Sequence, residues 1–204
     1  MVRKIRDPQS RTRIVEAAQR TIADLGVKGA TVRAIAAEAG VSTGYVMHYF
    51  EDKDQLAAAV LEHNNVVAAN RVLTARGRRR GLDGLTAAVE ALLPLTPERR
   101  IVWQVWVALW THARTESDPA AALTMARHAL AGILRQSFEE AVADGELPDG
   151  LDLEYEAERL TTLAAGLGLL AGVESTTRFR RVASRMLQDH LDALRHSPTR
   201  VAGG

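Results

Sequence analysis

The segment STGYVMHYFEDK at residues 42–53 gathers hydroxyl, phenol and imidazole side chains in a run too short and too polar for a core helix. Such groups exchange hydrogen bonds with phosphates and base edges, and their flat faces suit thymine methyl groups. Gly44 lets a sugar–phosphate backbone approach closely, and Lys53 adds a cation for a phosphate. These residue types therefore suit nucleic-acid binding. For each aromatic side chain taken alone, packing in the core is an equal alternative.

The rest of the sequence offers little for catalysis. It contains no cysteine, which excludes a disulfide framework, thiolate metal sites and cysteine nucleophiles. Its six histidines are scattered, without the spacing of a metal site. A nucleophile elbow and a glycine-rich phosphate loop are both missing from the sequence. We therefore expect no enzyme activity, no catalytic residue, no metal and no cofactor.

All three tryptophans lie in the segment ERRIVWQVWVALWTHAR. On a helix, Trp103, Trp106 and Trp110 fall within about 60° of one another and form a single stripe. The stripe is either a bulky core seam or the wall of a ligand cavity, and the sequence leaves both open. A cavity wall would suit a flat aromatic molecule or a quaternary ammonium cation held over the rings, with His112 as a polar contact.

Helical patterns extend over almost the whole chain. Sustained strand-like alternation is missing, and aromatic residues make up only 4%. Asp-Pro or Thr-Pro pairs at 7–8, 96–97 and 118–119 each place a capping oxygen before a proline at the first helical position. We predict an all-α fold of about nine helices. Their expected ranges are 8–25, 32–39, 43–49, 53–75, 82–93, 97–116, 119–144, 152–172 and 176–196.

Residues 8–50 have the pattern of a helix-turn-helix domain. We expect Thr31 to cap the second helix, Gly40 to turn the chain in a left-handed conformation, and Ser42 to cap the third helix. The residues expected to hold the third helix against the core are Val46, Phe50 and, in part, Met47. The polar side chains between them would then point outward.

The charge distribution is more informative than the net charge of +1. Residues 1–13 carry five basic side chains against Asp7 alone, and such an arm suits phosphate contact or, equally, a solvated tail. The N-terminus lacks the apolar region of a signal peptide, and the longest apolar runs are far shorter than the ~20 residues that cross a bilayer. We expect a cytoplasmic protein without a membrane partner, and binding to DNA would place it at the nucleoid.

The last two predicted helices carry broad apolar stripes. LTTLAAGLGLLAG alternates a leucine ridge with small residues, and FRRVASRMLQDHLDAL adds a second stripe. This is more apolar surface than one small bundle needs, so we expect a four-helix interface with a two-fold mate. Packing within the chain is the alternative. The expected interface residues are Leu163, Leu167, Leu170, Val182, Met186, Leu187 and Leu191.

Residues 12–56 closely resemble the DNA-binding domain of the tetracycline-repressor (TetR) family. The matching stretches are TRIVEAAQRTIADLGVKGATVRAIAAEAGVS and GYVMHYFEDKDQL. One departure is Met47, because the family usually places a phosphate-contacting tyrosine there. The WxxWVALW pattern, taken with VSTGYVMHYF, is similar to the branch typified by the choline–glycine betaine pathway repressor, which has a similar WxAFW segment.

This resemblance implies an N-terminal helix-turn-helix domain over 1–52 and a C-terminal ligand-binding and dimerisation domain over 53–204, joined by helix 53–75. It implies a repressor that binds a palindromic operator in double-stranded DNA as a homodimer and is released by a small effector, aromatic or quaternary ammonium. The alternatives are a small-molecule-binding helical protein without DNA-binding activity and a purely structural dimer. The implied DNA-facing residues are Thr31, Arg33, Ser42, Thr43, Gly44, Tyr45, His48, Tyr49 and Lys53. Base readout would fall mainly to Arg33, Thr43 and Tyr45.

Overall fold

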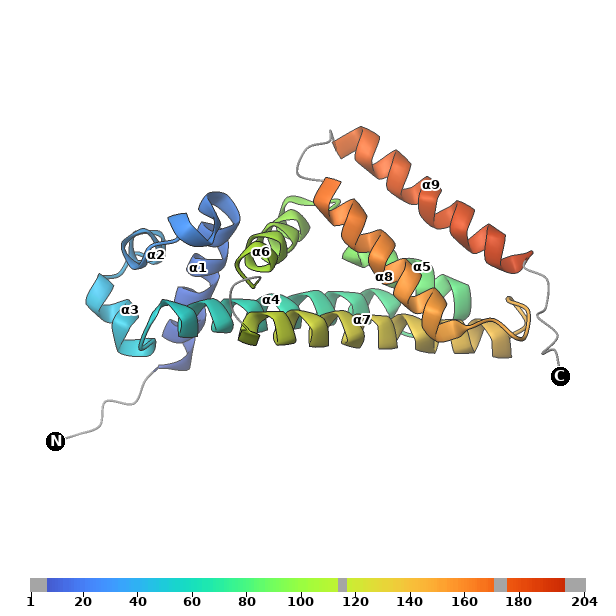
Figure 1. Cartoon of the computed structure of the whole chain (residues 1–204), viewed down its shortest axis with the longest axis horizontal. Helices are drawn as coiled ribbons and strands as arrows, with labels where there is room; N and C mark the ends of the chain where they lie inside the picture. Colours follow the sequence, from blue (N-terminus) through green and yellow to red (C-terminus); the bar gives the residue numbers. More distant parts are fainter. Residues whose placement is uncertain (1–6, 114–116, 171–175, 197–204) are drawn as a thin grey trace. The chain divides into compact units, whose positions relative to one another are not determined.

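The computed structural model describes residues 7–113, 117–170 and 176–196 of the 204-residue chain. Within these ranges it contains nine α-helices and no strand, which confirms the all-α prediction (Figure 1). The helices are α1 (Pro8–Gly29), α2 (Val32–Ala39), α3 (Thr43–Tyr49), α4 (Lys53–Arg76), α5 (Gly81–Leu92), α6 (Pro97–Ala113), α7 (Ser117–Ala143), α8 (Leu153–Leu170) and α9 (Thr176–Arg195).

The first three helices begin at side-chain caps. Asp7 accepts hydrogen bonds from the backbone N–H groups of residues 9 and 10, Thr31 from that of Ala34, and Ser42 from that of Tyr45. These bonds satisfy N–H groups that have no partner within the helix. Helix α1 is interrupted at Gly26, whose φ of 69° is left-handed, and continues to Gly29 beyond the expected end at residue 25.

By its contacts the chain divides into two compact units. The first contains residues 1–67 and 101–124, and the second contains residues 68–100 and 125–204. The first unit therefore holds the helix-turn-helix segment together with most of the tryptophan-bearing helix α6. Helix α4 contributes residues to both units.

The core of the first unit fixes the short helix α3. Val46 and Phe50 are buried, as expected, among residues such as Ile14 of α1 and Ile35 of α2. Met47 was expected to be partly in the core, but 43% of its surface is exposed. Val46, Tyr49 and Phe50 thus anchor α3, and the other side chains of the helix are exposed.

In the second unit, two arginines beside the turn between α4 and α5 are paired with acidic residues at the end of α7. Arg76 donates to Ser137 at 3.0 Å and pairs with Glu140 at 2.6 Å, with both charged side chains largely buried. Arg80 makes two 3.2 Å hydrogen bonds to Asp144. These contacts tie the turn between α4 and α5 to the end of α7.

The apolar stripes of α8 and α9 separate into an inner and an outer face. Leu167, Leu187 and Leu191 are 3–5% exposed and belong to the core within the chain, which corrects their expected place at a dimer interface. Leu163 is partly buried against the cluster of Leu93, Leu167, Phe179 and Ala183. The expected interface residues that remain exposed are Leu170, Val182 and Met186, at 49%, 40% and 44%.

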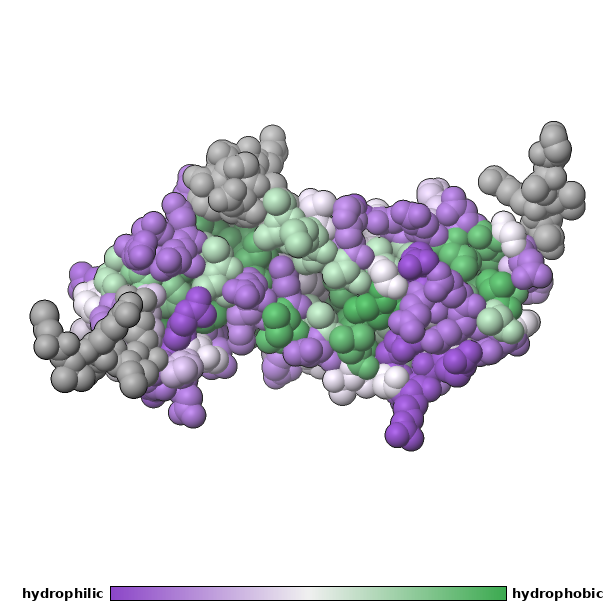
Figure 2. Space-filling view, turned by 90° about the horizontal axis from the view of Figure 1, so that it is seen from below, coloured by the Kyte–Doolittle hydropathy of each residue, from purple (hydrophilic) through white to green (hydrophobic). Residues whose placement is uncertain are grey.

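In the described part of the chain, no helix has the length and apolar character needed to cross a membrane. Figure 2 shows one face of the molecule, where hydrophilic side chains dominate and hydrophobic residues appear in patches between them.

A buried histidine lies between α8 and α9. The Nε2 atom of His190 is 3.4 Å from Glu156 Oε2, both side chains are at most 10% exposed, and Nε2 has no hydrogen-bond partner among the described residues. Glu156 is itself paired with Arg159 at 3.0 Å. Burial, and then the charge of Arg159, lower the pKa of His190 below 6.5, while Glu156 opposes this shift.

We therefore expect acid to destabilise the fold through His190. Its pKa is lower in the folded than in the unfolded chain, so the unfolded chain binds the proton more readily and stability falls as the pH drops through about 6.5. Urea unfolding at about pH 7.5 and about pH 5.5 measures this loss. A His190→Gln variant should lose less stability over the same interval, whereas an equal loss would show that other groups cause it.

Candidate nucleic-acid interface and effector site

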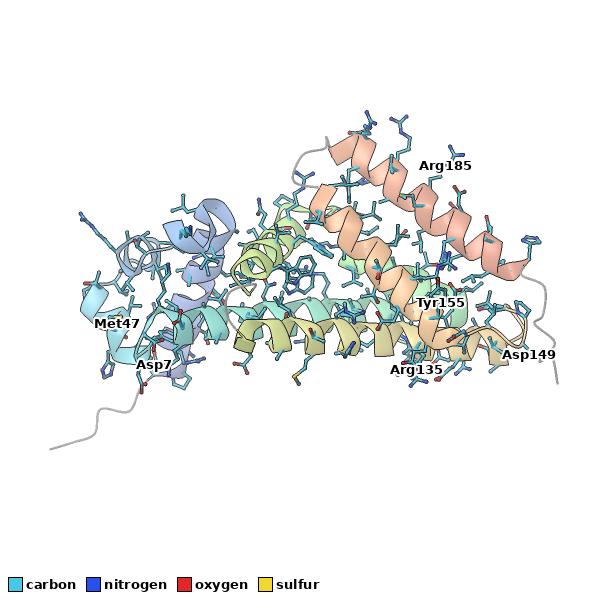
Figure 3. All side chains as sticks on the ribbon, in the orientation of Figure 1. Asp7, Met47, Arg135, Asp149, Tyr155 and Arg185 are labelled. Atoms are coloured by element: carbon cyan, nitrogen blue, oxygen red, sulfur yellow. The ribbon has the colours of Figure 1, made fainter. Side chains whose placement is uncertain are left out.

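The outer face of α3 carries the polar side chains expected there. Thr43, Gly44, Tyr45 and His48 are exposed, and the Met47 side chain, labelled in Figure 3, lies beside them. A Cβ placed on Gly44 would meet only Ser42 Oγ, at 3.9 Å, so this position is open toward solvent. The short helix therefore presents two hydroxyls, an imidazole and an apolar side chain on one accessible surface.

The neighbouring helix α2 adds Thr31 and Arg33, both exposed. The connection between α2 and α3 is a tight turn, in which Gly40 has a φ of 67° and donates its N–H to carbonyls at the end of α2. Only a residue that tolerates left-handed φ fits this turn without strain. The Arg20–Glu38 ion pair, at 2.7 Å, links α1 to α2 on the surface.

Two of the expected DNA-facing residues have other roles. Tyr49 is 7% exposed, and its ring packs edge-on against Tyr45 and His48 with centroids 5.4 Å apart in both pairs. Its ring therefore supports the outer face from the core side, whereas the expectation had placed Tyr49 on that face. Lys53 is half-buried, and its Nζ donates to the carbonyl of Val27 at 2.6 Å, tying α4 to the end of α1.

A network of hydroxyl groups joins α3 to the first turn of α1, near Asp7 in Figure 3. The Tyr45 hydroxyl donates to Ser10 Oγ at 3.0 Å, and Ser10 Oγ donates to Asp7 Oδ2 at 2.7 Å. The bond to Tyr45 raises the pKa of Tyr49. Sequence reasoning identified Asp7 as a cap but missed Ser10, because its partner lies 35 residues away.

The tryptophans form an edge-to-face cluster. The Trp103 ring is 4.9 Å from that of Trp106 and 6.4 Å from that of Trp110, with interplanar angles of 81° and 79°. Trp103 and Trp106 are each 5% exposed, whereas Trp110 is partly buried. His112 belongs to α6, but its side chain lies outside the part of the chain that the structure describes. The three tryptophans of the predicted stripe thus form one ring cluster, and two of them, Trp103 and Trp106, belong to the core.

A buried polar junction links this cluster to the helix-turn-helix segment. Asn64 of α4 is fully buried, accepts from Gln19 Nε2 of α1 at 2.7 Å, and donates to the Val102 carbonyl of α6 at 3.1 Å. The adjacent Asn65 accepts from Trp106 Nε1 at 2.8 Å. The signal available in the sequence was this pair of asparagines in the middle of a long helix, where asparagine is a poor helix former.

No group of three or more His, Asp or Glu side chains converges on a common point among the described residues. What the structure does bring together is a set of hydrogen-bonding groups on an exposed short helix and an aromatic cluster on another helix of the same unit. Both arrangements suit binding.

Two family models match the chain. Residues 14–60 match the model for bacterial regulatory proteins of the tetR family. Residues 81–196 match the model for the C-terminal part of BetI-type transcriptional repressors. The second match alone covers more than half of the 204 residues.

Similar proteins agree with these models. The HTH-type transcriptional regulator PksA of Bacillus subtilis is 27% identical over 203 residues, covering 98% of this chain and 97% of its own. The regulator BetI of Burkholderia thailandensis is 28% identical, with 90% and 92% covered.

Solved structures show the same fold. A TetR-family regulator from Rhodococcus sp. superposes with a TM-score of 0.78 at 26% identity, covering 91% of this chain and 98% of its own. A transcriptional regulator from Saccharomonospora viridis, solved in complex with choline, gives 0.79 at 25% identity, with 89% and 97% covered. The helix-turn-helix geometry and both family models therefore lead to one assignment: this chain is a helix-turn-helix transcriptional regulator of the TetR family, with a C-terminal domain of the BetI type.

Proposed function

We propose that this regulator is a repressor that binds a palindromic operator as a homodimer and leaves it when a quaternary ammonium compound such as choline binds. The exposed face of α3 is the observation that carries the proposal. Its side chains donate and accept hydrogen bonds, and its glycine gives room for a backbone. Each of the first three helices begins at a side-chain cap. A helix of this kind suits insertion into the major groove.

The tryptophan cluster supports the choice of effector class. A quaternary ammonium cation is attracted to the faces of aromatic rings, and tryptophan gives the strongest attraction. Trp110 is the member of the cluster that remains accessible. The similar protein from Saccharomonospora viridis was solved with choline, which is a cation of this class.

Two copies of α3 are needed for tight operator binding. A single short helix makes few base contacts, whereas two helices about 34 Å apart can read two half-sites on one face of the duplex. The exposed apolar residues Leu170, Val182 and Met186 on α8 and α9 offer a surface for pairing two copies.

The junction at Asn64 supports a route from effector to operator. Any shift of α6 relative to α4 would break a hydrogen bond in which Asn64, fully buried, and Val102, 4% exposed, both take part. If α4 moves together with α6, the bond from Asn64 to Val102 is kept. The bond from Gln19 to Asn64 would then pass the movement of α4 on to α1. Effector binding would in this way change the spacing of the two α3 helices, and a differential affinity of a few kcal/mol is enough to release DNA.

Selection from a library of random-sequence duplexes tests this function. The wild-type protein is expected to enrich an inverted repeat, and choline is expected to weaken binding to that duplex. Trp110→Ala should raise the choline concentration needed by about tenfold, because one cation–π contact contributes roughly 0.5–2 kcal/mol. Tryptophan fluorescence quenching measures choline affinity directly, without DNA.

The controls separate the parts of the proposal. Trp110→Phe keeps an aromatic face and should retain most of the choline affinity. If choline binds equally to wild type and Trp110→Ala, the effector site lies elsewhere. If choline quenches fluorescence but no duplex is enriched, the chain is a small-molecule-binding protein without DNA-binding activity.

A further inference from the structure

The hydroxyl of Ser10 has no hydrogen-bonding capacity left. A hydroxyl group has one hydrogen to donate and two lone pairs to accept. Ser10 Oγ is 2.7 Å from Asp7 Oδ2, 3.1 Å from Arg13 Nη2 and 3.0 Å from the Tyr45 hydroxyl. The serine is 4% exposed, so solvent has little access to it. Three partners therefore use its three positions.

The direction of each bond follows from the chemistry of these partners. The Asp7 carboxylate also accepts from the backbone N–H groups of Gln9 and Ser10, and an ionised carboxylate can only accept, so Ser10 gives it its one hydrogen. The Arg13 guanidinium can only donate. The third bond must then run from the Tyr45 hydroxyl to Ser10, because Ser10 has no second hydrogen.

The same reasoning determines which hydrogen bonds the Tyr45 hydroxyl can still make. Its hydrogen points inward to Ser10, so the Tyr49 hydroxyl, 3.5 Å away, must be the donor in the contact between the two phenols. What the Tyr45 oxygen has left is a lone pair. The Tyr45 residue as a whole is 37% exposed on α3. A group that reaches the hydroxyl oxygen would therefore meet an acceptor.

We propose that Tyr45 is a specificity-determining residue whose hydroxyl accepts a hydrogen bond from an amino group on a base edge, the N4 of cytosine or the N6 of adenine. These are the two donors that the major groove presents. Phosphate oxygens, guanine O6 and N7, and thymine O4 have no hydrogen to give to this oxygen. Ser10 is the positioning residue that imposes this polarity. The inference rests on the proposed function, because it requires α3 to enter the major groove.

Base analogues test the inference on the duplex selected by the wild-type protein. At each position in turn, adenine is replaced by purine and cytosine by pyrimidin-2-one, which lack the N6 and N4 amino groups. Fluorescence anisotropy at fixed salt then measures the affinity. At one position of each half-site, wild type is expected to lose about fivefold in affinity, the effect of one hydrogen bond.

Three variants make the assignment specific. Tyr45→Phe keeps the ring packing against Tyr49 but has no acceptor, so it should show no loss at that position. Ser10→Ala frees the Tyr45 hydrogen, so the hydroxyl can donate as well as accept and the dependence on the amino group should weaken. Tyr155→Phe alters an exposed tyrosine of α8 and should behave like wild type.

Comparing the variants on the same duplexes removes any effect of the analogues on the DNA itself. The inference is overturned if wild type tolerates the loss of every amino group. It is also overturned if Tyr45→Phe keeps the wild-type dependence. If wild type selects a duplex and then gives one of these two results, the inference about Tyr45 is rejected and the proposed function stands. If wild type selects no duplex, the inference and the proposed function are both rejected.

Discussion

Replacing Asn64 by leucine is expected to lower the free energy of unfolding by about 3 kcal/mol, although the two side chains have similar volumes. The Asn64 side chain is fully buried and makes one hydrogen bond as acceptor and one as donor. Leucine can make neither. The Gln19 side-chain amide and the Val102 carbonyl would each lose the hydrogen bond to Asn64. An unsatisfied buried polar group costs about 1–3 kcal/mol.

Urea unfolding followed by circular dichroism measures this loss. Asn70→Leu is the matched control, because the same substitution is then made on the same helix at an exposed position. It should change stability by less than about 0.5 kcal/mol. Equal effects of the two substitutions would show that the junction contributes nothing to the fold beyond helix propensity.

The stability of this junction bears on regulation. Couplings between two ligand sites are typically about 1–3 kcal/mol, which is the size of the hydrogen bonds that join α6 to α4 and α4 to α1. Under the proposed function, these bonds would hold the three helices together in both states of the regulator. An effector bound at the tryptophan cluster would then displace α6, α4 and α1 together.

The sequence predicted those features that depend on neighbouring residues. Asp7, Thr31 and Ser42 cap helices because their oxygens reach N–H groups two or three residues away, and Gly40 turns the chain by its own φ. The bonds of Ser10 to Tyr45 and of Gln19 to Asn64 span 35 and 45 residues. Only the packing of three helices brings these side chains together, so no local pattern reveals them.

Two expected placements differ from the structure, each for its own physical reason. Val46, Tyr49 and Phe50 are spaced at i, i+3 and i+4, so helix geometry alone puts Tyr49 on the buried side, whereas the family resemblance had placed it outside. Helix α9 carries two apolar stripes, one through Leu187 and Leu191 and one through Val182 and Met186. Periodicity shows that both exist, but only packing shows that the first faces the chain's own core.

The exposed stripe leads to the second large effect. Met186→Asp is expected to convert the proposed dimer to a monomer at micromolar concentration. In a two-fold interface each substitution occurs twice, and a carboxylate that is buried without a partner costs several kcal/mol. A loss of about 4 kcal/mol corresponds to about a thousandfold weaker dimer. Light scattering coupled to size-exclusion chromatography measures the mass, and the folded helix content should remain unchanged because Met186 is 44% exposed.

Leu73→Asp is the control for this change, since it places the same charge at a residue of α4 that is 50% exposed. It should leave the mass unchanged. The monomer produced by Met186→Asp still carries an intact α3, so it should bind a single half-site weakly and lose its preference for the inverted repeat. A variant that stays dimeric would place the interface away from the Val182–Met186 stripe. A monomer with undiminished affinity for the full operator would show instead that one copy of α3 is sufficient, and the two-fold reading of the operator would then be wrong.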